Sequence, residues 1–399
     1  MNHRLLPLAS RLRRELFATP LDGLISVGLV VGLGAGLQAL LHWALTQADW
    51  AVVQANSTLL VVGRYPLEQQ WRLWLLTALL CGAAGITWGL LRGRGWPRSD
   101  RLAAAVLLVL GVVLPASLGL TAPIQQRWWW ITGLLLLGRW AAGCWGAALP
   151  LRWRRLLPLA WPVLYLLGLG LIGGGLGLMT VRPSQWGGLL LTLIEASFAI
   201  LVCFPLGIAL ALGRRSALPL LRWCSTLYIE FIRGAPLITL LFLGQNILGF
   251  LLPGGLAPDR VWRAAWILTC FAAAYVAEAV RAGLAALPRG QWEAARSLGL
   301  NMAQTLLHVV LPQALRVALP ATVGQFITLL QDTTLLSLIG LLDLLGVARA
   351  VMANPEFLGR NAEVYLVLAV LFWCCCAALG LGSRALEHRL NRHSLRSEP

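Results

Sequence analysis

The 399-residue chain contains no lysine, and charged residues make up only 12% of it. Hydrophobic residues make up 58%, which is more apolar surface than a water-soluble core of this length can bury. The shortage of charge therefore excludes a soluble protein. It predicts an all-α polytopic membrane protein in a lipid bilayer.

Motifs for catalysis and cofactor binding are also missing. The sequence has no GxxxxGK[ST] loop to hold a nucleotide and no CxxC pair, and its five histidines do not cluster with acids or cysteines. We therefore expect no enzymatic activity, no metal and no cofactor on this chain. The net charge of +16 comes from arginines dispersed between apolar runs, so we expect no nucleic-acid partner.

Apolar windows of about 20 residues, the length that a helix needs to cross a bilayer, recur along the whole chain. Arginine clusters follow even-numbered windows, whereas the intervening loops are poor in arginine. Because positively charged loops stay on the cytoplasmic side, this pattern predicts that both termini are cytoplasmic. The ten windows lie near 23–45, 73–91, 102–121, 129–149, 156–178, 187–212, 237–256, 262–283, 317–342 and 363–383.

The two halves of the sequence differ in composition. The first five windows are rich in Leu and Trp, with few polar residues inside them apart from Arg139, which is typical of a scaffold. From Trp186 onward the apolar windows carry polar groups. We expect an N-terminal membrane region at 1–180, a functional core at 186–384 and a cytoplasmic tail at 385–399.

A polar segment at 288–312 interrupts the apolar windows of the second half. Pro288 and Gly299 fit the start and the end of a short helix. The run 301–304 begins with Asn and ends with Gln, the spacing of a capping box, so we expect a second short helix that Pro312 ends. The predicted result is a helix, a turn and a helix outside the bilayer.

The first of these helices has a small apolar face formed by Ala294, Ala295 and Leu298. Glu293 and Arg296 are one turn apart, and we expect them to form an ion pair that stiffens the helix. Such a rod suits docking into the groove of a partner. An ordinary amphipathic loop between two spans is the alternative.

Charged residues inside apolar windows cost roughly 2.5 to 3.5 kcal/mol each at the centre of a span, so each needs a partner or a watery cavity. Glu278 can pair with Arg281 one turn on, and we expect a structural salt bridge there. Asp332 has no local partner. Glu195 has none either, and its two alternatives are a contact with Arg139 or another span, and a role in solute binding.

The segment 331–334 concentrates hydrogen-bonding side chains in the middle of the ninth window. Such side chains could hold a polar solute after it has lost its water, and the alternative is a polar clamp between helices. The candidate solute path therefore comprises Gln331, Asp332, Thr333 and Thr334, with Glu278 next.

The segment 228–238 leads into the seventh window. Glu230 and Arg233 lie one turn apart, and Gly234 with Pro236 allows a sharp bend as the chain enters the membrane. One interpretation is a gating hinge, and the other is a bend that the ion pair fixes.

The patterns of two other transporter classes are not visible. A channel would need a filter or a charged ring, and a secondary carrier would usually need more buried ionisable groups in two matched halves. A docking segment on a chain without its own ATP site indicates instead that a partner supplies energy. A carrier or channel that acts without an ATPase remains the alternative.

The docking segment resembles the EAA signature of ABC importer permeases, in the elements Glu293-Ala294-Ala295, Gly299 and Leu311-Pro312, with Val309 where Ile is usual. The resemblance covers about 186–384. Segments around it are similar to the polar amino acid branch of that family, namely Tyr228-Ile229-Glu230, Arg233-Gly234-Ala235-Pro236-Leu237, Ala277-Glu278 with Arg281, and Asp332-Thr333-Thr334-Leu335. By length and topology, the five preceding windows resemble those of the larger permeases of general L-amino acid importers.

This resemblance implies a five-helix core like that of type I ABC importers, in a bacterial inner membrane. The implied partners are a second related permease or a second copy of this chain, two ATPase subunits that bind ATP and Mg, and a periplasmic amino acid-binding protein. The family usually has Lys at the position of Gln331, and an amide there would weaken pairing with a carboxylate. The implied ATPase-coupling residues are Glu293, Ala294, Ala295, Gly299, Leu311 and Pro312.

Overall fold

The computed structural model describes residues 16–17, 19–113, 122–146, 151–175, 177–251 and 258–391, and within them the chain forms helices and no strand. Each of the ten predicted windows falls on a helix, although parts of the windows 102–121, 129–149 and 237–256, and the tail beyond 391, lie outside the described residues. Six described helices are long and apolar enough to cross a membrane, or seven when one bent pair counts as a span. The prediction of an all-α polytopic protein is confirmed.

The N-terminal region packs mainly through two helices that approach closely at glycines. Gly85 and Gly89 of α5 lie so near the backbone of α8 that neither position has room for a Cβ atom. The described helices of this region are α2 (Pro20–Thr46), α3 (Ala51–Ala55), α4 (Ser57–Val62), α5 (Trp71–Arg92), α6 (Arg98–Leu108), α8 (Ala122–Trp145) and α9 (Leu151–Gly173).

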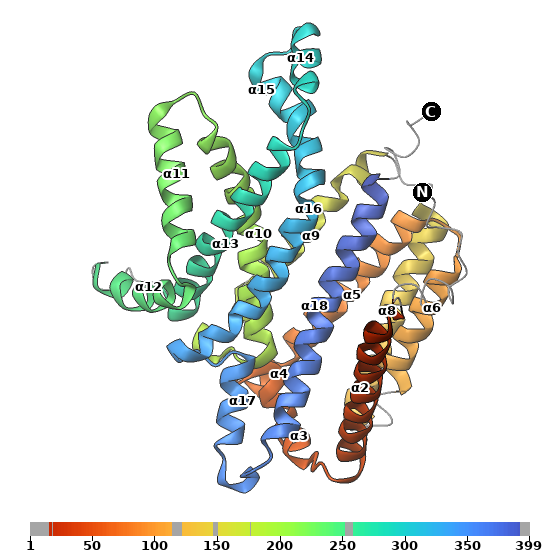
Figure 1. The fold of residues 1–399 in the computed structure, drawn as a ribbon. Coiled ribbons are helices and arrows are strands. Elements are labelled where there is room, and N and C mark those ends of the chain that lie inside the picture. The colour runs from red at the N-terminus through yellow and green to blue at the C-terminus, as the bar shows by residue number, and fades with distance from the viewer. Residues whose placement is uncertain are drawn as a thin grey trace.

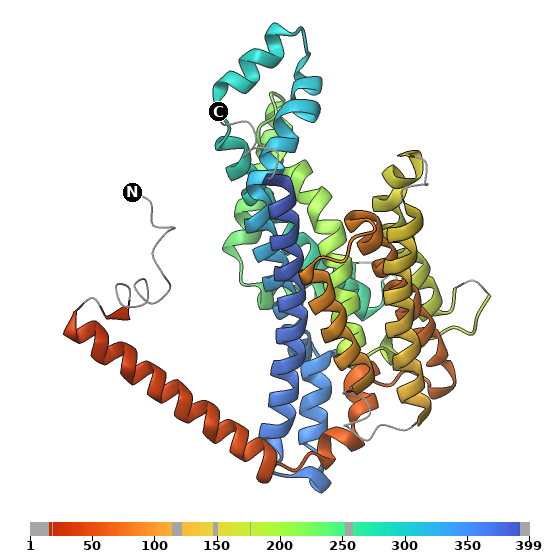
Figure 2. The ribbon, with the colours of Figure 1, turned by 90° about the vertical axis from the view of Figure 1, so that its right-hand side faces the viewer.

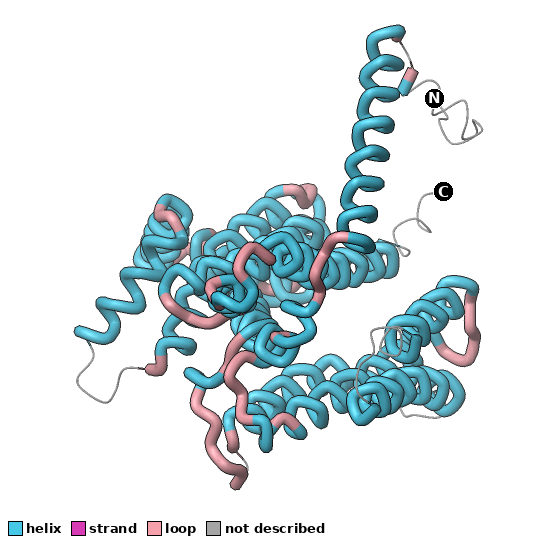
Figure 3. Tube along the Cα trace, turned by 90° about the horizontal axis from the view of Figure 1, so that it is seen from below, coloured by secondary structure: helices cyan, strands magenta, loops and turns pink. Residues whose placement is uncertain are grey.

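Helix α2 differs from its neighbours because its contacts within the described chain are confined to residues close to its own ends, such as the ring of Trp50 against Trp43. Thr19 and Asp22 form a capping box at its start, but none of its residues is buried. Figures 2 and 3 show it extending away from the other helices. A 27-residue apolar helix of this kind is long enough to span a bilayer by itself.

The core of the second half is built around α13 (Arg260–Ala285), whose alanines let neighbouring helices approach closely. Its buried face packs on α10 (Gly188–Arg214) and α16 (Leu311–Asp332), and Gly207 of α10 lies directly against Val276. The long C-terminal helix α18 (Asn361–Asn391) packs on α16. These helices run side by side in Figure 1.

A different short helix lies at each end of this bundle, and each end is named after its helix. At the α14 end, the short helix α14 (Arg289–Ser297) projects beyond the other helices (Figure 1). At the α17 end, α17 (Leu344–Met352) lies with α3 and α4 from the N-terminal region (Figure 1).

A sharp bend separates α11 (Pro219–Gly234) from α12 (Leu237–Leu251). The two helices meet at 108°, and the residues between them are Ala235 and Pro236. The predicted bend is therefore present, but a helix already precedes it. Together the two helices form a broken span or a re-entrant loop that begins at Pro219. The apolar window at 237–256 covers only its second helix.

Candidate functional site

The first docking helix has the bounds that the sequence predicts. Pro288 is the N-cap of α14, and Gly299 follows its C-terminus with a φ of 74°, in the left-handed region that glycine adopts without strain. The N–H groups of Gly299 and Leu300 bond back to carbonyls of the last turn, at 2.9 and 3.2 Å. The turn after α14 is thus tightly closed.

The second docking helix does not end where the sequence predicted. Asn301 and Gln304 form the expected capping box of α15 (Met302–Gln304), but a π-helix at 305–310 leads from it directly into α16. Proline lacks an N–H and crowds the carbonyl four residues earlier, and the wide π-turn before Pro312 relieves this conflict. The prediction that Pro312 ends the helix is wrong, because one 38-residue helical stretch, Met302–Ile339, crosses it.

The exposed face of α14 is smaller than predicted. Leu298 is 81% exposed and Ala294 is exposed, so both remain available to a partner. Ala295 is only 2% exposed and packs inward. The expected ion pair is absent, since among the described residues neither Glu293 nor Arg296 is paired with an opposite charge.

A side-chain contact joins α14 to the long helix that follows it. The Gln313 amide donates to the Gln291 side-chain oxygen at 3.0 Å and to the Val309 carbonyl at 2.8 Å. Thr305, in the π-helix, is buried. A displacement of α14 therefore acts on the first turns of α16, where Leu311 and Pro312 lie.

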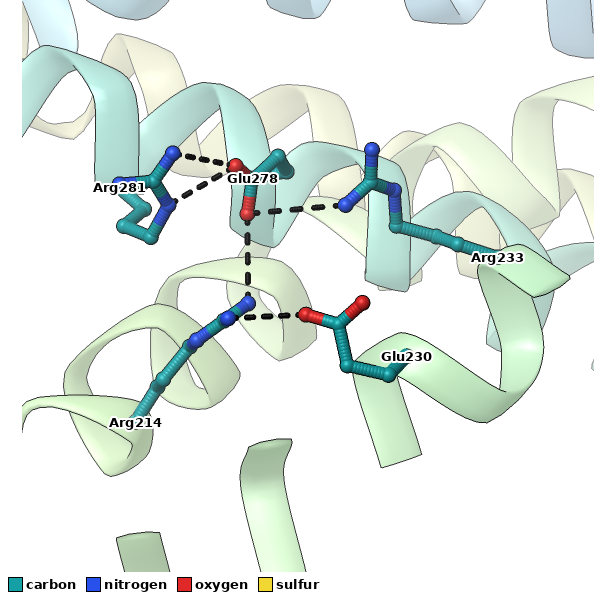
Figure 4. A network of polar contacts seen from close by, with 5 residues as sticks. All are labelled: Arg214, Glu230, Arg233, Glu278 and Arg281. Carbon is teal, nitrogen blue, oxygen red and sulfur yellow. Dashed lines mark hydrogen bonds and ion pairs between the residues drawn. The ribbon is translucent and has the colours of Figure 1, made fainter. Parts of the chain in front are cut away.

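Glu278 is the centre of a charge network near the α14 end (Figure 4). One carboxylate oxygen accepts two bonds from Arg281, at 2.5 and 2.8 Å, which confirms the predicted salt bridge. The other oxygen lies 3.5 Å from Arg214 and 3.8 Å from Arg233. The network thereby ties α10, α11 and α13 together.

The predicted pair of Glu230 with Arg233 does not form. Arg214 takes Glu230 instead, with a 2.8 Å bond, and Arg233 points to Glu278 and lies over the ring of Tyr275 at 5.5 Å from its centroid. Tertiary neighbours thus outcompete a partner one turn away. Sequence reasoning missed Arg214, which belongs to a loop cluster that was interpreted only as a topology marker.

The candidate solute path offers fewer free groups than the sequence indicated. The hydroxyls of Thr333, Thr334 and Ser337 donate to carbonyls three residues earlier, at 2.6 to 2.8 Å, as α16 tightens into a 3-10 helix at 333–339. The hydroxyl hydrogens of these side chains are therefore already bonded to the backbone. Thr333 is also fully buried.

The other two members of the path differ from each other. Gln331 is exposed and makes one long contact, 3.9 Å, to the sulfur of Cys376 on α18. The Asp332 carboxylate is partly exposed and has no hydrogen bond or ion pair with any described residue. Asp332 is therefore the charged member of the path that has free bonding capacity, beside the neutral amide of Gln331.

Glu195 lies inside the bundle near the α17 end. It is fully buried, and neither of its carboxylate oxygens has a partner among the described residues. One turn earlier on α10, the Thr192 hydroxyl accepts the Leu344 N–H at 3.1 Å, which places Glu195 beside the start of α17. Asp343 caps that start, and burial raises its pKa to about 7 although it accepts two backbone N–H bonds.

Arg139 does not pair with Glu195. It bonds Asp100 at 2.9 Å, donates to two backbone carbonyls, and lies over the rings of Trp88 and Trp96. Arg139 and Asp100 are both buried. This pair, which the sequence analysis missed, connects α6 to α8 within the N-terminal region.

The comparisons with known proteins agree with this geometry. Residues 203–392 match the family described as "Binding-protein-dependent transport system inner membrane component". The chain is 35% identical over 386 residues to the inner membrane amino-acid ABC transporter permease protein YhdY of Escherichia coli (strain K12), covering 95% of this chain and 92% of the relative. The chain belongs to the amino-acid ABC transporter permease family. It is a transport subunit whose ATPase is a separate chain, and the family match includes the segment 293–312.

Two further relatives of the permease differ in the length they share with it. The glutamate/glutamine/aspartate/asparagine transport system permease protein BztC of Rhodobacter capsulatus is 36% identical over 373 residues, 87% of this chain and 80% of that protein. The probable glutamine ABC transporter permease protein GlnM of Bacillus subtilis (strain 168) is 34% identical over 202 residues, 50% of this chain but 90% of that protein. Membership of this family does not support a carrier or channel that acts alone.

Proposed function

We propose that this permease belongs to an ATP-driven importer of polar L-amino acids in a bacterial inner membrane. The cargo class follows the names of the relatives that align along most of the chain, an amino-acid permease and a glutamate/glutamine/aspartate/asparagine permease. The dispersed arginines favour an orientation with the α14 end and both termini in the cytoplasm. The α17 end then faces outward.

The observation that carries the proposal is the continuity between an exposed docking helix and a membrane-spanning one. Ala294 and Leu298 leave an apolar surface free on α14, and the helical stretch Met302–Ile339 runs from its base to the α17 end of the bundle. An ATPase that binds this surface can therefore displace α16 by moving α14. Gly299 gives the tight turn, Glu293 remains free to meet a partner, and Leu311 with Pro312 forms the joint.

The remaining partners follow from the importer class. Two ATPase subunits bind ATP and Mg, a second related permease or a second copy of this chain completes the membrane channel, and a periplasmic binding protein delivers the amino acid. The unpaired Asp332 carboxylate is suited to attract the ammonium group of the cargo. Gln331, Thr333 and Thr334 shape its surroundings, and Glu278 acts in the charge network.

Uptake in proteoliposomes tests this function. The permease is reconstituted with its ATPase, its partner permease and the binding protein. Vesicles that hold ATP on the same side of the membrane as the ATPase should accumulate a labelled polar amino acid. Omission of the ATPase should abolish accumulation. Accumulation that persists without the ATPase, driven by an ion gradient, would establish a secondary carrier instead.

A further inference from the structure

The segment 49–66 lies between α2 and α5, outside the residues 203–392 that match the transport-system family description. It packs on the functional core at the α17 end. Val52 and Leu60 are buried in an apolar cluster whose other buried members come from α17 and α18, namely Leu344, Val347, Ala348, Val351, Val364 and Leu368. The N-terminal region thus supplies part of the interior of the core.

Polar contacts fasten the start of this segment to α18. The Asp49 N–H donates to the Glu363 carboxylate at 3.1 Å, and the Asp49 carboxylate forms an ion pair with Arg360 at 3.2 Å. Glu363 is itself buried, so the backbone bond is shielded from water. These contacts join residues more than 300 positions apart in the sequence.

The end of the segment meets α10 at a glycine junction. Gly63 has a φ of 64° and lies against the backbone of Gly187, where a Cβ atom would not fit. Gly188 faces the Leu60 carbonyl equally closely, and its N–H bonds the Leu342 carbonyl at 2.9 Å. Three chain segments therefore cross at one point, which only glycine permits.

The same segment is tied to the N-terminal bundle on its other side. The Tyr65 hydroxyl donates to the Ile172 carbonyl of α9 at 2.9 Å. Just beyond the segment, the buried Arg72 donates to the Met179 carbonyl at 2.8 Å. Residues 49–66 consequently bridge the N-terminal bundle, α10, α17 and α18.

The contacts at the opposite end have another character. There α10, α11 and α13 are joined by ion pairs whose side chains are 25% to 55% exposed, in addition to buried packing such as Gly283 of α13 against the backbone of Ala314 on α16. Such ion pairs break and re-form readily. Close-packed interiors, by contrast, resist gradual deformation. Three ion pairs between helices at the α14 end can therefore exchange partners, whereas among the described contacts of 49–66 one ion pair, Asp49–Arg360 with both side chains 45% exposed, accompanies buried apolar and glycine contacts.

We propose that residues 49–66 form a permanent clamp, which keeps α10, α17 and α18 together throughout the transport cycle. Movement driven through α14 then separates the helices of this subunit at the α14 end only. The clamp gives the N-terminal region, which lies outside the matched range 203–392, a mechanical task. This inference rests on the proposed ATP-driven import.

Reversible cross-linking tests the clamp. In a variant whose eight native cysteines are replaced and whose ATP-driven uptake is retained, Asp49→Cys with Arg360→Cys reports on the clamp, and Arg214→Cys with Glu230→Cys reports on the α14 end. A short thiosulfonate linker that spans the clamp pair should leave the rate of uptake within about twofold of the rate before linking, as for a substitution away from critical contacts. The same linker across the second pair should abolish uptake, and a reductant should restore it.

Several results would overturn the proposal. The proposal is wrong if linking the clamp pair abolishes uptake. It is also wrong if linking the second pair leaves uptake undiminished. Linking yield gives a reading that needs no transport, because the clamp pair should link equally with and without ATP, while the second pair should not. Equal ATP dependence of both yields would contradict the clamp even if the protein imported nothing, whereas absent ATP-driven uptake in the unmodified protein counts only against the proposed function.

A glycine variant covers the case in which the cysteine pairs do not fold. Gly63→Ala should wedge the clamp open and raise the ATP hydrolysed per amino acid imported. The matched control is Gly177→Ala, since Gly177 also has a positive φ, 77°, but has open space around it. Equal coupling ratios in the two variants would overturn the proposal.

Discussion

The α14 end and the α17 end of the bundle both have buried packing, but they differ in their charged contacts. At the α14 end, two carboxylates and three guanidinium groups share partly exposed contacts around Glu278. At the α17 end, helices meet through buried apolar residues and glycine contacts. Exposed ion pairs contribute about 0 to 1 kcal/mol each, and their partners exchange easily. On the clamp proposal, these exchangeable pairs allow the α14 end to move, while the contacts of 49–66 with α10, α17 and α18 persist.

The largest effect is expected at the turn that transmits force to the α14 end. Gly299→Val places a branched side chain at a φ of 74°, a conformation that costs an L-residue about 1 to 2 kcal/mol, and adds bulk beside the docking face. We expect uptake and co-purification of the ATPase to be lost while membrane insertion is retained.

Gly359→Val is the matched control for this variant. Gly359 has a φ of 86° and, like Gly299, open space around it, but it lies beyond α17. The control should retain the ATPase. If both variants bind the ATPase and import equally, the turn after α14 has no special role and the contrast between the ends fails.

The charge network gives the next effect. Glu278→Gln leaves three arginines without their shared partner, and we expect a loss of roughly 1 to 3 kcal/mol of stability because charged hydrogen bonds are removed. Glu230→Gln breaks one pair whose carboxylate is 55% exposed, so its effect should be at most about 1 kcal/mol.

Thermal unfolding of the detergent-solubilised proteins measures this difference. A lower melting temperature for Glu278→Gln than for Glu230→Gln is expected. Equal melting temperatures would show that Glu278 is not the centre of the network.

Two neighbouring alanines sharpen the account of α14 itself. Ala295 is buried, so Ala295→Leu should overpack its site and lower stability by about 1 to 3 kcal/mol. Ala294 is exposed, so Ala294→Leu should leave the melting temperature unchanged and alter only the affinity for the ATPase. Reversal of these two outcomes would mean that the other face of α14 meets the partner.

The smallest effect is expected inside the α17 end. Burying a carboxyl group without a partner costs the least free energy when the group is neutral, and Gln has nearly the shape of a protonated Glu. Glu195→Gln should therefore change uptake and melting temperature little, by about 0.5 kcal/mol or less. A loss of uptake in Glu195→Gln that Glu195→Asp restores would show that its negative charge is needed.

The sequence predicted the elements that local chemistry determines. The described part of each of the ten apolar windows is helical, and the positions of Pro288 and Gly299 gave the bounds of α14. The capping box at Asn301 also formed as expected. In each case the deciding interaction lies within a few residues, so spacing alone carries the information.

The errors came from long-range competition. Glu230 and Arg233 were one turn apart, but each found a partner on another helix. Pro312 should have ended a helix, yet a π-turn accommodated it within a continuous stretch. The clamp at 49–66 could not be predicted, because it depends on contacts with residues more than 100 positions away.

Cross-linking from the exposed surface of α14 tests the central claim most directly. In the cysteine-replaced background, Leu298→Cys is the probe and Leu358→Cys, at the opposite end, is the control. The two native side chains are almost equally exposed, at 81% for Leu298 and 78% for Leu358. With a bifunctional thiol reagent in native membranes, the account predicts a cross-link from position 298 to the ATPase and none from position 358. A cross-link to the ATPase from position 358, or none from position 298, would contradict the account.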